Sequence, residues 1–107
     1  MSSRPLAVDV IESGFAPDHD GARWIFTGAL TFANAGSVLA ATTALSLPAE
    51  GEVDLDNLDG IDSSALAVLV ALARRAESEG RPLRFVHVPA AAAALAQTYG
   101  VEWVLGT

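Results

Sequence analysis

The chain contains no cysteine and no lysine. Without cysteine it can form neither disulfide bonds nor thiolate metal sites. No apolar run approaches the roughly 20 residues that cross a bilayer, and the first dozen residues lack the apolar core of a signal peptide. We therefore expect a cytoplasmic protein that does not insert into a membrane directly.

Positive charge is scarce. Six basic residues, all arginine, stand against thirteen acidic ones, for a formal net charge of −7. This balance argues against nucleic acid and anionic lipid surfaces as direct partners. Hydrophobic residues make up 51% of the chain, which indicates a compact fold rather than disorder. We predict a single domain spanning residues 1–107, because this length suits one core.

The most informative stretch runs from residue 53 to residue 72. Apolar and acidic residues alternate over 53–56, which is the period of a half-buried strand. Residues 57–61 are expected to form a short loop. Asp62, Ser63 and Ser64 then offer the oxygen acceptors that cap a helix, and helical apolar spacing follows them. Two hydroxyl groups therefore lie where a strand passes into a helix.

Strand and helix patterns alternate along the rest of the chain. The first two strands would pair as an antiparallel hairpin, and the later ones would pair in parallel because helical crossovers join them. The predicted order is ββαβαβα, with a last edge strand as an option. Strands are expected at 6–11, 22–30, 53–56, 83–88 and 101–105, a turn at 13–21, and helices at 35–45, 63–79 and 89–99.

The run V-D-L-x-x-L-x-x-I-D-S-S-A-L over residues 53–66 resembles the signature of the STAS domain, the fold of anti-sigma-factor antagonists. Within that family the chain is most similar to the small subunit of Mla-type phospholipid ABC transporters. By element order the resemblance covers about residues 6–105. It implies an α/β, STAS-like fold: a mixed four- to five-stranded sheet with helices mainly on one face.

Ser63 and Ser64 have two interpretations. As a helix cap, one hydroxyl stabilises the helix by about 1 kcal/mol, although Asp62 could already serve. The resemblance implies more: the second hydroxyl of the antagonist motif accepts phosphate, which corresponds to Ser64. In the Mla-type subunit the hydroxyl directly after the aspartate lies at the partner interface, which corresponds to Ser63. A phosphate on either residue would suit a helix N-terminus but add charge to an apolar contact.

Two residues depart from the antagonist pattern. Ala65 stands where antagonists usually carry glycine. Thr31 stands after Gly-Ala-Leu, where they usually carry an acidic residue that engages the kinase. Both departures argue against binding to an anti-sigma-factor kinase, and neither disturbs the expected fold.

The expected fold predicts that Leu55 of the central strand and Leu69 of the helix after Ser64 are core residues. That helix is apolar over a wider arc than one sheet-facing stripe requires. Val68 and Leu72 extend that arc. Neighbouring helices could bury them, or they could form a partner-binding ridge rimmed by Arg74 and Arg75. The predicted partner-binding residues are Asp62, Ser63, Ser64, Ala65, Val68 and Leu72.

Four aspartates, at positions 54, 56, 59 and 62, form an acidic row, which a solvated strand face explains better than a metal site. His19 belongs to a polar turn and His87 to a strand end, and nothing places either histidine near Ser63. There is no glycine-rich phosphate-binding motif. We predict no catalytic residue, no metal and no cofactor.

These observations predict a non-catalytic protein-interaction subunit. By resemblance, its partner is the cytoplasmic ATPase of a phospholipid ABC transporter, which would hold it at the periphery of the inner membrane. The alternative is an anti-sigma-factor antagonist that is switched by serine phosphorylation and binds an anti-sigma-factor kinase. A small-molecule or nucleotide-binding enzyme is a third class. It would show saturable ligand binding, which we do not expect.

Overall fold

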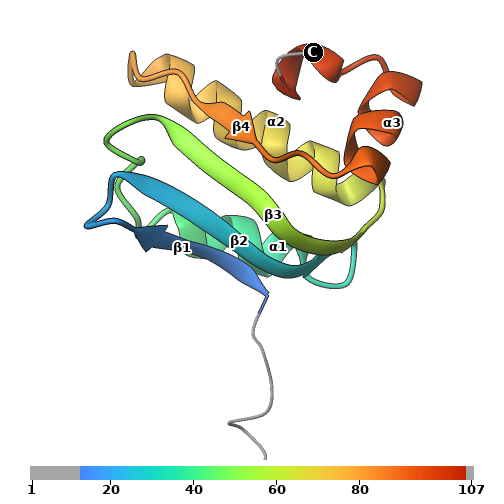
Figure 1. Ribbon diagram of the computed structural model, residues 1–107, viewed down its shortest axis with the longest axis horizontal. Coiled ribbons are helices and arrows are strands. Elements are labelled where there is room, and N and C mark those ends of the chain that lie inside the picture. Colours follow the sequence, from blue (N-terminus) through green and yellow to red (C-terminus); the bar gives the residue numbers. More distant parts are fainter. Residues whose placement is uncertain (1–12, 106–107) are drawn as a thin grey trace, which may run out of the picture.

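The computed structural model describes residues 13–105 (Figure 1). Its element order is ββαβαβα followed by a short 3-10 helix, so the predicted fold class is confirmed. The elements are β1 (Gly14–Asp18), β2 (Arg23–Leu30), α1 (Ala35–Thr42), β3 (Glu52–Ile61), α2 (Ser63–Ser78), β4 (Arg84–Val86), α3 (Ala90–Thr98) and η2 (Glu102–Leu105).

The described strands form one mixed sheet in the order β1-β2-β3-β4. β1 is antiparallel to β2, while β2, β3 and β4 run parallel because α1 and α2 carry the crossovers between them. Figure 1 shows α1 and α2 behind the same face of the sheet. The predicted arrangement of helices mainly on one face is therefore confirmed.

The core lies between the sheet and α2. Trp24 and Phe26 of β2 and Leu55 of β3 are fully buried, and Leu69 of α2 is 1% exposed. The Trp24 indole N–H donates to the carbonyl of Ser46 at 3.2 Å, so its polar atom is not lost to the core. Leu55 and Leu69 were both predicted as core residues, and both predictions are confirmed.

β3 is longer than the sequence indicates. Its pairing with β2 shifts twice. β3 has one extra residue opposite the step from Ile25 to Thr27 of β2, and another opposite the step from Gly28 to Ala29. Each bulge interrupts the alternation of side chains along the strand. Leu58 consequently lies in the core at 7% exposure. The predicted loop over 57–61 is wrong, because the strand continues through these bulges to its end before Asp62.

β1 occupies a segment that was predicted to be a turn. Its glycine and proline suggest a turn, but an edge strand tolerates proline because its outer N–H needs no partner in the ladder. Phe15 favours the strand, since its ring packs 4.8 Å from Phe26 and 5.7 Å from Trp24, measured between ring centroids. The strand predicted at 6–11 lies outside the described residues.

The end of the described chain is helical rather than a fifth strand. Gly100 adopts a φ of 71°, and the N–H of Val101 donates back to Ala96 at 2.9 Å. This reversal places η2 against α3, where Val104 and Leu105 are buried. The predicted edge strand over 101–105 is therefore wrong. No helix in residues 13–105 has the length and apolarity needed to cross a membrane.

Candidate partner-binding site

Asp62 joins the start of α2 to the loop that follows β2. Its Oδ2 accepts the backbone N–H of Phe32 at 3.0 Å, and its Oδ1 accepts that of Ser64 at 2.8 Å. These hydrogen bonds, that of Phe32 above all, outweigh desolvation and hold the pKa of Asp62 below its usual value. Asp62 is thus the ionised N-cap, one of the alternatives that the sequence left open, and it also fixes a loop 30 residues away in sequence.

The loop from Thr31 to Asn34 is held from its other side by Asn34. The side-chain oxygen of Asn34 accepts the Thr31 N–H at 2.9 Å, and its amide donates to the carbonyl of Ala29 at 2.9 Å. Phe32 is 83% exposed within this braced turn. Sequence reasoning missed Phe32. The available signal was a lone aromatic residue among small and polar ones.

The structure separates the two serines. Ser63 is exposed at the first position of α2, and its hydroxyl has no hydrogen-bond partner among residues 13–105. Ser64 is half-buried, and its hydroxyl contributes to the lowered pKa of Asp62 by hydrogen bonding to the carboxylate. That Ser63 meets a partner stays a prediction, but Ser63 is the serine whose hydroxyl has no competing bond within the described chain.

Three of the predicted partner-binding residues lie in the core. Ala65 and Val68 are 2% exposed and Leu72 is 1% exposed. The reason is that α2 contacts α1 and α3 as well as packing into the core, so more than one stripe of the helix is covered. The predicted ridge over Val68 and Leu72 is therefore wrong.

A groove lies instead on another side of α2, where it meets the end of α3. We call it the α2–α3 groove; its volume is about 410 Å³. Ser63 lies near one end and Arg74 near the other, three helical turns along α2. Between them the lining is aliphatic or aromatic: Leu66, Ala67, Val70, Ala71, Tyr99 and Val101.

The two arginines that were predicted to rim the helix differ in role. The Arg75 guanidinium donates to the carbonyls of Thr42 and Leu45 at 3.0 and 2.8 Å and to Glu79 at 3.0 Å. Arg74 is exposed beside the α2–α3 groove and makes no hydrogen bond or ion pair with any described residue. Of these two arginines, Arg74 is therefore the one that is available to a partner.

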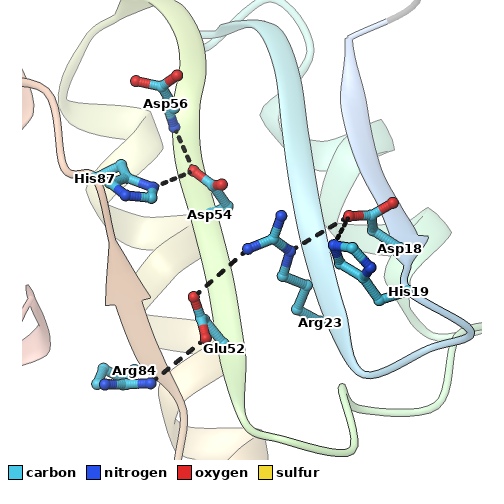
Figure 2. A network of polar contacts seen from close by, with 8 residues as sticks. All are labelled: Asp18, His19, Arg23, Glu52, Asp54, Asp56, Arg84 and His87. Atoms are coloured by element: carbon cyan, nitrogen blue, oxygen red, sulfur yellow. Dashed lines mark hydrogen bonds and ion pairs between the residues drawn. The ribbon is translucent and has the colours of Figure 1, made fainter.

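Asp54 and Asp56 of the acidic row lie on β3 (Figure 2). Asp54 is 8% exposed, accepts the Asp56 N–H at 2.9 Å and lies 3.0 Å from His87 Nδ1. Burial alone would raise the pKa of Asp54. The contacts with Asp56 and His87 and the positive charge of Arg23 together outweigh burial, so the pKa of Asp54 lies below its usual value. The prediction of a solvated face holds for Asp56 and Asp59, which are exposed, and is wrong for Asp54.

The aspartates of this row do not converge. Over residues 13–105, no group of three or more histidine, aspartate or glutamate side chains is placed to hold a metal ion. Neither histidine forms a hydrogen bond or ion pair with a serine of the described chain: His19 lies 3.3 Å from Asp18, and His87 lies 3.0 Å from Asp54.

Fold and site together define a class of protein: a small α/β domain with helices mainly on one face of a mixed sheet and a capped helix that begins directly after the inner strand β3. A protein-family model described as "Mlab, STAS domain" matches residues 25–106. No curated protein matches the chain significantly. Because the family match covers most of the chain, the protein belongs to the STAS domain family. STAS domains are generally non-catalytic and typically mediate protein–protein interactions.

Proposed function

We propose that this protein is a non-catalytic subunit, one domain over residues 1–107, that binds another protein through the surface around Ser63. The carrying observation is the arrangement at Ser63. Its exposed hydroxyl follows Asp62, which fixes the exposed Phe32, and it lines the α2–α3 groove together with Tyr99. Exposed aromatic side chains beside polar groups are the usual anchors of protein interfaces.

The partner we propose is the cytoplasmic ATPase of a phospholipid ABC transporter. The protein would stabilise or tune this ATPase, and would stay in the cytoplasm at the inner membrane through it. Three features support this choice: the Asp62-Ser63 motif, the wording of the matched family model, and the two departures from the antagonist pattern at Thr31 and Ala65.

Co-purification with that ATPase, expressed from the same genome, tests the proposal. The parent protein is expected to form a stable complex, and the Ser63→Asp variant is expected to melt like the parent but not to co-purify. The helix N-terminus tolerates an anion, whereas an interface must desolvate it without a partner. Ser63→Ala is the matched control and should still bind. Recovery of a sigma-factor regulator without any ABC ATPase would contradict the proposal.

A second candidate function is the phosphorylation-switched antagonist, and the exposed Ser63 hydroxyl at the positive end of α2 favours it. A phosphate on Ser64 would instead meet the ionised Asp62 carboxylate. Phosphopeptide mass spectrometry of stressed cells tests this function, with phosphate expected on Ser63 rather than Ser64. Silence at both serines would count against an antagonist.

A further inference from the structure

We infer that the α2–α3 groove is the docking site for an amphipathic helix of a partner protein, and that this helix brings an acidic side chain to Arg74. The inference rests on the proposed function in assuming a protein partner. It adds the secondary structure and the charge of the partner segment that binds, and the place on this chain where that segment binds.

The shape of the groove suits a helix. From Ser63 to Arg74 it follows α2 for three turns, about 16 Å at 1.5 Å per residue. Ala67 and Ala71 are one turn apart on the same side of α2, and their small side chains allow a second backbone to approach closely. Tyr99 and Val101 form the opposite wall. Such a groove accepts apolar side chains spaced at i, i+3, i+4 and i+7.

The chemistry of the lining also favours a helix over an extended segment. An extended peptide carries unpaired backbone N–H and C=O groups, which are costly to bury without partners. Among the lining side chains only Ser63, Tyr99 and Arg74 carry polar atoms. Beyond its first turn, where Asp62 accepts the Ser64 N–H, α2 pairs its backbone N–H groups within the helix. A helix arrives with its own backbone hydrogen bonds made and needs none from the groove.

Arg74 determines the charge of the occupant. The chain as a whole carries −7, yet the only charged side chain lining this groove is an arginine. Arg75 is bonded to two carbonyls and a carboxylate, whereas Arg74 has no partner in the described chain. A docked helix would partly desolvate the guanidinium, and a carboxylate on that helix would then pair with it bidentately.

The first experiment selects helical peptides from a displayed library. The library would be a 14-residue Ala/Glu/Lys helix with one face randomised, panned against the purified full chain. Selected peptides are expected to share an apolar stripe at i, i+3, i+4 and i+7 and an acidic residue near one end. A selection that returns no binder, or binders without the stripe, would overturn the inference.

Variants then locate the bound peptide by fluorescence anisotropy. Ala67→Arg places a long charged side chain in the groove and should weaken binding by about tenfold or more. Arg74→Glu should weaken binding about tenfold and reverse the preference towards a peptide whose acidic residue is replaced by lysine. Ala94→Arg on α3 and Arg81→Glu after α2 are matched exposed controls, which should change binding by less than about twofold.

Binding that is unchanged by Ala67→Arg would place the peptide elsewhere, and binding unchanged by Arg74→Glu would remove the acidic contact; either result overturns the inference. Sedimentation of the unliganded protein tests whether a second copy of this chain occupies the groove. A dimer that dissociates in the Ala67→Arg variant would show that it does, and would overturn the inference. Thermal melts that match the parent would show that both substitutions leave the fold intact.

The same variants separate this inference from the proposed function. If the ABC ATPase co-purifies equally well with Ala67→Arg and with the parent, the docking site is wrong while the function stands. If selected helices bind the groove but the ATPase does not co-purify, the docking site stands and the proposed partner is wrong.

Discussion

Asp54 and Asp62 belong to the same acidic row and begin with the same local bond. Each accepts the backbone N–H of the residue two positions later, at 2.9 Å for Asp54 and 2.8 Å for Asp62, and each has a lowered pKa. Their second contacts differ. Asp54 meets the side chain of His87, whereas Asp62 meets the backbone N–H of Phe32.

That difference decides what each region offers to another molecule. Around Asp54, charged side chains pair with one another across β2, β3 and β4: Arg23 lies 3.8 Å and Arg84 3.4 Å from Glu52 (Figure 2). Around Asp62 the carboxylate holds two backbone N–H groups and the Ser64 hydroxyl, while the side chains of Phe32 and Ser63 are exposed. The region with more charge is therefore internally satisfied, while the less charged region presents groups for binding.

The largest expected effect concerns the core that lies under both regions. Leu69→Ala should lower the free energy of unfolding by about 2–5 kcal/mol, because Leu69 is 1% exposed and truncation leaves a cavity. Urea denaturation measures it. A loss below about 1 kcal/mol would mean that α2 does not present this face to the core.

Asp54→Ala should cost stability without affecting partner binding. The substitution leaves the N–H of Asp56 and the ring of His87 without their acceptor, a loss of about 1–2 kcal/mol. Denaturant melts give the cost, and co-purification with the ATPase gives the binding. Weakened binding at unchanged stability would reverse the contrast between the two regions.

Acid should destabilise the protein through both carboxylates. The folded pKa of each lies below its usual 3.8, so the stability each contributes is fully present above that value and is lost as the pH falls through the folded pKa. Melting temperatures should be level near neutrality and decline below about pH 4. Asp54→Asn and Asp62→Asn should each make that decline shallower, and an unchanged slope would contradict the assigned hydrogen bonds.

Phe32→Ser should have the opposite profile to Asp54→Ala. The side chain is 83% exposed, so stability should change by less than about 0.5 kcal/mol, while partner binding should weaken about tenfold or more if Phe32 is an anchor. Isothermal titration with the purified partner measures the second effect. Trp103→Ser is the matched control, because Trp103 is another exposed aromatic residue and lies beside Ala73 and Glu77, in the half of α2 that is remote from Ser63.

The smallest effect is expected at Ser63. Ser63→Ala should change the free energy of unfolding by less than about 0.5 kcal/mol, because Asp62 rather than Ser63 caps α2. A loss near 2 kcal/mol, the upper end for a lost N-cap, would show that its hydroxyl serves the helix after all.

The sequence predicted what depends on local pattern. Period and composition indicated the order of strands and helices and the buried Leu55 and Leu69, and they offered Asp62 as one possible N-cap beside the two serines. They failed where distant neighbours decide. Val68 and Leu72 are buried because α1 and α3 contact α2, and nothing in the helix itself distinguishes them from exposed residues.

The same reason explains the missed parts of the site. Arg74 and Arg75 are adjacent in sequence, yet only Arg75 reaches the carbonyls of Thr42 and Leu45, 33 and 30 residues earlier. The contact between Asp62 and Phe32 spans 30 residues. β3 was predicted too short because its bulges break the alternation that identifies a strand.

The hydrogen bonds that the Asp62 carboxylate accepts have a consequence for divergence within the family. The carboxylate holds residue 32 only through its main-chain N–H, and the Ser63 side chain makes no hydrogen bond within the described chain. Replacements at these two positions therefore leave the hydrogen bonds of the loop and the helix start in place. A duplicated gene can acquire a new binding preference by changing side chains that folding does not use, so recognition and stability can evolve separately here.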